Sequence, residues 1–176
     1  MVDTKRVLIV IASQQFRDEE YQVPRKLLEA AGAKVTVASS KLAPSTGMLG
    51  AVVTPDVLLK DAKAADFDAI VFVGGSGAKE YWSDPTAHSL AKEFHAKGKP
   101  TSAICIAPVT LANAGILKGK AATSWPDVVS MVAAKGATMK SQGCVADGNV
   151  ITADGPESAE AFGKALVKAL VKALRG

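Results

Sequence analysis

Cys105 is the residue of this sequence best placed for nucleophilic chemistry. It stands between an extended apolar segment, residues 101–104, and a helix-forming segment, residues 109–114. A strand that turns directly into a helix presents the turn residue at the sheet edge where α/β proteins bind ligands. The helix dipole favours negative charge there, so we expect a thiol pKa below the value of about 8.5 for a free cysteine. The alternative is that Cys105 is simply a small buried residue.

A carboxylic acid and a pair of glycines are further candidates for this edge. Glu20 closes an acidic stretch, residues 18–20, that suits the first turn of a helix. Gly74 and Gly75 follow the apolar segment 67–73, and glycines at a strand end allow backbone N–H groups to face a ligand. Each signal is weak alone, because acids are common at helix starts and glycines are common after strands.

The second cysteine and the two histidines lack the spacing of a site. Cys144 begins a predicted hairpin strand, where we interpret it as a packing residue, with a resolving cysteine as the alternative. His88 and His95 are seven residues apart on one predicted helix, so they lack the i,i+4 spacing of a zinc-binding pair. We therefore predict no metal site.

Strands that alternate with helices must position these residues. Continuous apolar runs rich in β-branched residues predict buried strands, and the segments between them have helical periodicity. We expect a small hairpin within residues 39–55 and a second hairpin that turns at Asp147-Gly148. This alternation predicts an α/β fold in one domain, residues 1–176, with a doubly wound, mostly parallel sheet sandwiched by helices. The predicted strands are residues 7–12, 33–38, 67–73, 101–104, 120–124 and the two arms of 144–152.

The composition is that of an ordinary globular protein. The chain has 176 residues, of which 48% are hydrophobic and 22% charged, and a formal net charge of +4. No arginine-rich or aromatic-basic cluster indicates nucleic acid, and we expect no signal peptide and no membrane span. Two cysteines without paired spacing argue against a disulfide framework and fit a reducing cytoplasm, where we expect the protein.

Four motifs are spread over essentially the whole chain. They are Phe-Asp-Ala-Ile-Val-Phe-Val-Gly-Gly at residues 67–75, Ala-Ile-Cys at residues 103–105 followed by Pro108, Asp-Gly-Asn-Val-Ile-Thr at residues 147–152, and Glu20 four residues before Pro24. With these motifs the sequence resembles the DJ-1/PfpI family. The resemblance implies a flavodoxin-like fold and assembly into a homodimer or a larger homo-oligomer.

The same resemblance implies the roles of particular residues. Cys105 would be a nucleophile in a strained elbow, with no cofactor, and the carboxyl of Glu20 would hydrogen-bond to its sulfur. The backbone N–H groups of Gly75 and Ile106 would form an anion or oxyanion hole. Gly74 would line the pocket. Tyr81, Trp82 and Trp125 are expected at its mouth, with packing in the core as the alternative for such aromatic residues.

Two departures from the family pattern bear on the reaction. The protease-like branch has histidine directly after the cysteine, where this chain has Ile106, and the DJ-1 branch has histidine where this chain has Trp125 in Ser124-Trp125-Pro126. A Cys-His-Asp triad is therefore not expected, which argues against an intracellular peptidase or amidase, because a peptide leaving group requires a general acid near neutrality.

A thiol paired with a carboxylic acid still suffices for some reactions. Burial and a nearby thiolate would both raise the pKa of Glu20, so that it could donate a hydrogen bond to sulfur and carry a proton. We expect an enzyme that acts on a small electrophilic carbonyl, as in the conversion of a 2-oxoaldehyde to a hydroxy acid. The alternative is a non-catalytic redox sensor or chaperone-like stress protein that signals through oxidation of Cys105.

Overall fold

A seven-stranded sheet forms the centre of the protein. The computed structural model describes residues 1–175; Gly176 and the side chains of Leu174 and Arg175 lie outside this description. The strand order is β10-β11-β7-β6-β1-β2-β5, and every pairing is parallel except that between β10 and β11. The strands are β1 (Arg6–Val10), β2 (Lys34–Ser39), β5 (Val57–Leu58), β6 (Ala69–Phe72), β7 (Thr101–Ile104), β10 (Cys144–Asp147) and β11 (Val150–Ala153).

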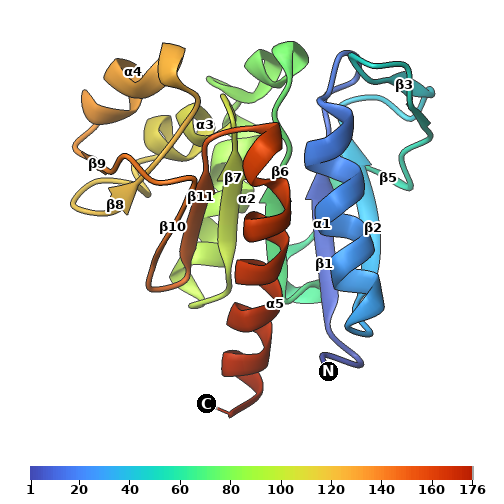
Figure 1. Cartoon of the computed structure of the whole chain (residues 1–176). Helices are drawn as coiled ribbons and strands as arrows, with labels where there is room; N and C mark the ends of the chain where they lie inside the picture. The colour runs from blue at the N-terminus through green and yellow to red at the C-terminus, as the bar shows by residue number, and fades with distance from the viewer. Residues whose placement is uncertain (176) are drawn as a thin grey trace.

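Helices cover both faces of this sheet (Figure 1). Helices α1 (Asp18–Ala30) and α5 (Ala159–Arg175) pack together on one face, and α2 (Pro85–Ala96) and α3 (Pro108–Asn113) cover the other. Helix α4 (Val129–Ala133) lies beyond the carboxyl ends of the strands. The predicted α/β fold with a mostly parallel, doubly wound sheet is confirmed, and the order of the five main parallel strands is that of flavodoxin-like proteins.

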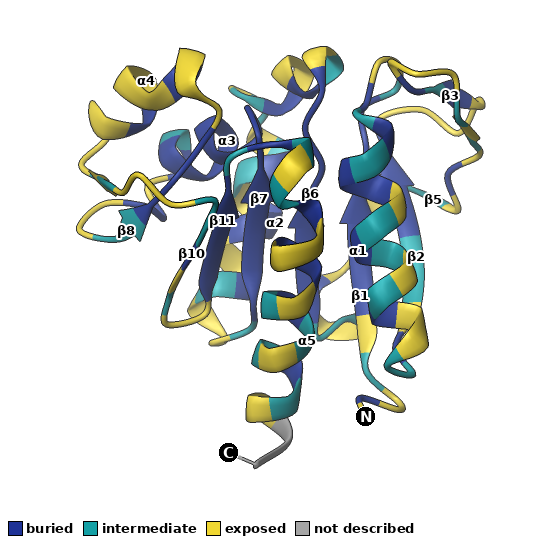
Figure 2. Ribbon diagram, in the orientation of Figure 1, coloured by how far each residue is buried: buried dark blue, intermediate teal, exposed yellow. Residues whose placement is uncertain are grey.

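Local sequence explains the main elements. Residues 7–10 of β1 are at most 1% exposed, as an apolar strand buried on both faces should be, and Figure 2 shows the same burial across β6 and β7. Helix α2 begins where the Asp84 carboxylate accepts hydrogen bonds from the N–H groups of Thr86 and Ala87. Pro24 lies inside α1.

Short elements fill the connections. The hairpin expected within residues 39–55 is present as β3 (Ser45–Thr46) and β4 (Val52–Val53). The second hairpin turns at Gly148-Asn149 rather than at the predicted Asp147-Gly148, because Asp147 pairs with Val150. The other short elements are β8 (Ala121–Ala122), β9 (Thr138–Met139), η1 (Leu59–Asp61), η2 (Ala64–Asp66), η3 (Ser76–Tyr81), η4 (Pro126–Val128) and η5 (Pro156–Ser158).

The strand order gathers three loops at one edge of the sheet. Neighbouring strands β1, β6 and β7 all end there, and the chain continues into α1, η3 and α3 respectively. The order reverses between β1 and β6, and ligands of open α/β sheets bind at such a switch point. Residues far apart in sequence, such as Glu20, Gly75 and Cys105, are therefore brought together.

No helix within residues 1–175 is both long and apolar enough to cross a membrane.

Candidate active site

Cys105 occupies a strained turn immediately after β7. Its φ is +68°, in the left-handed region that residues with a side chain rarely adopt. Hydrogen bonds hold it there: its N–H donates to the carbonyl of Ala153 at 2.9 Å, and its own carbonyl accepts from the N–H of Trp125 at 2.8 Å. Such strain persists only where the surrounding structure fixes the conformation. The turn places the Cys105 sulfur at a cavity.

Glu20 reaches the same point from the first turn of α1. Its side chain is fully buried, and neither carboxyl oxygen has a hydrogen-bond partner of good geometry among the described residues. Gly74 makes this approach possible, because a Cβ at that position would lie 2.4 Å from Glu20 Oε1 and 2.5 Å from Cys105 Cβ. A buried carboxyl whose oxygens make no well-formed hydrogen bond is unfavourable for stability, so its position beside a thiol points to a function.

Burial decides the protonation of the Glu20 carboxyl. Loss of solvent raises the pKa of Glu20 to about 8, against smaller lowering effects of the Cys105 thiol and the N–H of Gly74. The acid is therefore mostly protonated at neutral pH. This agrees with the raised pKa that we expected for Glu20.

The pKa of the Cys105 thiol is shifted in the direction opposite to our expectation. Burial, followed by the negative charge that Glu20 can carry, raises the pKa of Cys105 to about 12. The backbone N–H groups of Gly75 and Ile106 act in the other direction and lower the thiol pKa, but by less. The prediction of a pKa below that of a free cysteine is wrong because it counted the helix start and not the exclusion of water.

The two backbone N–H groups that lower the thiol pKa are those of Gly75 and Ile106. Gly75 has a φ of +98°, and a Cβ there would lie 2.4 Å from the backbone nitrogen of Arg17, so only glycine fits. The anion or oxyanion hole that the resemblance implies for Gly75 and Ile106 stays a prediction. The arrangement can stabilise negative charge on the sulfur or on an oxygen beside it.

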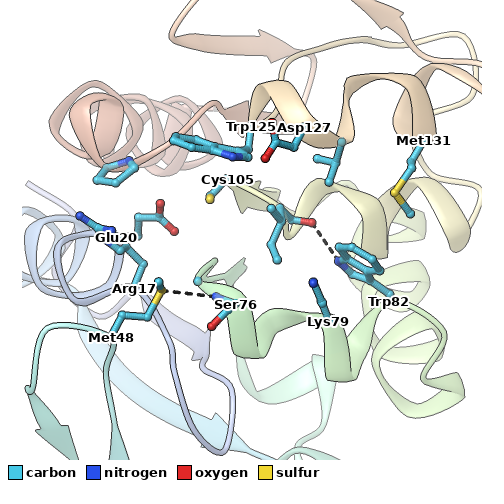
Figure 3. A pocket seen from close by; sticks show the side chains of 14 residues that line it. Arg17, Glu20, Met48, Ser76, Lys79, Trp82, Cys105, Trp125, Asp127 and Met131 are labelled. Carbon is cyan, nitrogen blue, oxygen red and sulfur yellow. Dashed lines mark hydrogen bonds between the residues drawn. The ribbon is translucent and has the colours of Figure 1, made fainter.

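Cys105 lines a cavity of about 440 Å³ (Figure 3). Trp82 and Trp125 line it, as expected, but two other predicted lining residues do not. Gly74 is packed beneath Glu20, and Tyr81 is buried elsewhere, where its hydroxyl donates to the carbonyl of Ile11 at 2.8 Å. The lining residues are Arg17, Glu20, Met48, Gly75, Ser76, Lys79, Trp82, Cys105, Ile106, Trp125, Asp127, Val128, Met131 and Pro156.

Sequence reasoning missed the charged residues of this cavity. Lys79 lies four residues after Gly75 on η3, and Asp127 lies two residues after Trp125 on η4. Either could have been found by asking which polar side chains flank the family motifs. Arg17, three residues before Glu20, also lines the cavity and pairs with Glu19.

No histidine lines the cavity in the described part of the chain. His88 contacts the carbonyl of Trp82 at 2.9 Å, behind the cavity wall. Trp125 occupies the rim and is 39% exposed. Cys144 is a free, half-buried cysteine on β10 and lines a different surface cavity, beside α5.

Comparison with known proteins agrees with this geometry. The family model described as the DJ-1/PfpI family matches residues 5–169. An uncharacterized protein of Methanocaldococcus jannaschii is 45% identical over 170 residues, covering 95% of this chain and 83% of that protein. A protein of Pyrococcus abyssi named as a deglycase is 31% identical over 163 residues, covering 93% and 98% of the two chains.

A solved structure is also closely similar. The crystal structure of a ThiJ/PfpI domain protein from Brachyspira murdochii superposes with a TM-score of 0.94 at 36% identity, covering 97% of this chain and 98% of that one. The fold, the position of the strained cysteine and the match of the family model along the chain lead to one conclusion. This chain belongs to the DJ-1/PfpI family.

Proposed function

We propose that this protein is a cysteine-dependent enzyme that acts on small electrophilic carbonyl compounds, with glyoxalase-like or deglycase-like chemistry. One observation carries the proposal: a fully buried Glu20 carboxyl, whose oxygens make no hydrogen bond of good geometry among the described residues, lies beside the Cys105 thiol at a cavity. The Pyrococcus abyssi relative named as a deglycase supports the same class of reaction. The cytoplasmic location and the homo-oligomer stay predictions.

The reaction of a 2-oxoaldehyde can be followed step by step. In the fraction of molecules in which Glu20 is ionised, its carboxylate accepts the thiol proton as the sulfur of Cys105 bonds to the aldehyde carbon. The resulting alkoxide is stabilised by the N–H groups of Gly75 and Ile106 and then takes the proton from Glu20. Glu20 is now a base again, next to the carbon that must lose a proton.

The remaining steps move protons and add one water. Glu20 removes the proton from the former aldehyde carbon, which gives an enediolate. The hydroxyl proton of that carbon passes to the former ketone oxygen, and Glu20 returns its proton to the neighbouring carbon, which gives a 2-hydroxy thioester. Water then cleaves the carbon–sulfur bond, releasing a 2-hydroxy acid and restoring the thiol. No oxidant or reductant is required, because the aldehyde carbon is oxidised as the neighbouring ketone carbon is reduced.

The other candidate functions have weaker support. A redox sensor must present a thiolate to peroxide, whereas burial and the charge of Glu20 both raise the pKa of the Cys105 thiol. A peptidase requires a general acid for the leaving amine, and no histidine lines the cavity within the described residues. We expect no cleavage of casein by the purified protein.

Conversion of methylglyoxal to lactate tests the proposal. We expect turnover by the wild type, loss of turnover in Cys105→Ala and in Glu20→Gln, and unchanged turnover in Cys144→Ala, the matched control outside the cavity. Conversion by Cys105→Ala at the wild-type rate would refute the role of the thiol. Absence of conversion by the wild type would refute the proposed reaction.

A further inference from the structure

Lys79 projects into the cavity from η3, on the side away from Glu20. Figure 3 shows its ammonium group directed into the cavity next to Trp82. Much of the surrounding wall is apolar, from the side chains of Met48, Ile106 and Met131. Lys79 itself is exposed, so its ammonium stands at the solvent edge of this wall, where it can meet an anionic group on a bound molecule.

The neighbouring charges do not neutralise Lys79. Its ammonium makes no ion pair with any residue in the described part of the chain. The adjacent Glu80 carboxylate accepts hydrogen bonds from Ser13 and Ser40 on the other side of η3. Asp127 also lines the cavity, but it lies with Trp125 on the opposite rim (Figure 3).

Arg17, the other cation of the cavity, is already occupied. Its guanidinium donates two hydrogen bonds to Glu19, at 2.9 and 3.1 Å. These bonds use Nε and Nη2 and pair the guanidinium with one carboxylate. Lys79 is therefore the cation that remains available to a ligand.

Trp82 fixes Lys79 relative to the reactive sulfur. The lysine nitrogen lies 5.8 Å from the centroid of the Trp82 ring. The indole N–H donates to the carbonyl of Ile106 at 3.0 Å, and Asn113 donates to the carbonyl of Trp82 at 2.7 Å. Because Ile106 directly follows the nucleophile, one hydrogen bond connects the surface that carries Lys79 to the elbow.

We propose that Lys79 is a specificity-determining residue that binds an anionic group, a carboxylate or a phosphate, on the carbonyl substrate. The site then prefers 2-oxoaldehydes that carry such a group over neutral ones. The reacting aldehyde lies between Cys105 and Glu20, and the anionic end extends along the apolar wall to the ammonium. This inference rests on the proposed function for the identity of the reaction, but not for the binding of the anion.

Turnover of three substrates tests the preference. They are 4,5-dioxopentanoate, which carries a carboxylate, 3-phosphooxy-2-oxopropanal, which carries a phosphate, and neutral methylglyoxal. In Lys79→Met the ratio of kcat/KM for an anionic substrate to that for methylglyoxal should fall about tenfold or more, the effect expected for one charge-assisted hydrogen bond. Lys79→Arg should retain most of the ratio, and Lys92→Met, on exposed α2 surface, should keep the wild-type ratio. An equal ratio in the wild type and Lys79→Met overturns the inference.

A binding measurement separates this inference from the proposed function. Levulinate and dihydroxyacetone phosphate carry a ketone and an anionic group, and 2-pentanone is a neutral counterpart. At least one of the anions should slow alkylation of Cys105 by iodoacetamide in the wild type but not in Lys79→Met, and 2-pentanone should protect less.

The turnover and protection measurements distinguish failure of the proposed function from failure of the anion site. Protection that depends on Lys79, without conversion of any 2-oxoaldehyde, would refute the proposed function and keep the anion site. Conversion with no dependence of the substrate preference on Lys79 would keep the function and overturn the anion site. Protection by a carboxylate but not by a phosphate, or the reverse, identifies the anionic group.

Discussion

Replacing Glu20 by glutamine should stabilise the protein increasingly as the pH rises from 5 to 8. The folded protein holds this carboxyl with its pKa raised from 4.5 to about 8, whereas the unfolded chain exposes it to water. Below pH 4.5 both states are protonated, and Glu20 causes no dependence of stability on pH. Between pH 4.5 and 8 the unfolded state ionises and the folded state does not, so the free energy of unfolding of the wild type declines.

The size of the decline follows from the pKa of Glu20. One pH unit corresponds to about 1.36 kcal/mol, so the rise from 4.5 to about 8 destabilises the wild type by about 4 kcal/mol at pH 8 and by less than about 1 kcal/mol at pH 5. Glutamine does not ionise, so the free energy of unfolding of Glu20→Gln does not decline in this way. For a chain of this length the difference corresponds to about 10 °C in Tm at pH 8.

Urea unfolding at pH 5, 6, 7 and 8, with a reductant present, measures the effect. Burial of the glutamine amide adds a contribution that does not vary with pH, so the informative quantity is the slope of the difference between Glu20→Gln and wild type. Glu19→Gln is the matched control, because the pKa of Glu19 is lowered by Arg17 and the residue is ionised in both states over this range. A difference between Glu20→Gln and wild type that stays constant from pH 5 to 8 would refute the buried, protonated carboxyl.

Three further predictions concern the same site. The kcat/KM of the wild type for methylglyoxal should rise with pH through about 8, because Glu20 must be ionised to act as the base; a fall over this range in a pH–rate profile would contradict that role. Iodoacetamide should alkylate Cys105 faster in Glu20→Gln than in wild type at pH 9, because the variant lacks the negative charge that raises the thiol pKa; peptide mapping that finds equal rates would show that this charge has no effect. Gly74→Ala should lower stability by about 1–3 kcal/mol, since the new Cβ would lie 2.4 Å from Glu20 Oε1, and a thermal melt equal to that of the wild type would show that the elbow can widen.

The sequence predicted the framework of the site well and its electrostatics less well. Segment 101–104 followed by Cys105 predicted both β7 and the turn that follows it, because a short apolar strand and a helix start are local features. The exclusion of water around the sulfur was not predictable, since it depends on α1, η3 and η4, which come from three separate parts of the chain. The direction of the Cys105 pKa was wrong for this reason.

The side chains of the cavity show the same difference between local features and features that depend on the fold. Trp82 and Trp125 were predicted to line it from their proximity to the motifs, and both do. Tyr81 has the same proximity, but η3 turns its side chain toward the core, where its hydroxyl contacts Ile11. Neighbours on a 3-10 helix point in different directions, so proximity in sequence cannot decide which of them faces the ligand.

The strained conformation of Cys105 also has a consequence for biosynthesis. The hydrogen bonds that hold its backbone come from Trp125, twenty residues later, and from Ala153, at the end of the last strand. A ribosome-bound chain that has extended only through residue 140 already contains the cysteine but lacks its partner on β11. We therefore expect the left-handed turn to form only after β11 docks beside β7, so that Cys105 reaches its final conformation in one of the last steps of folding.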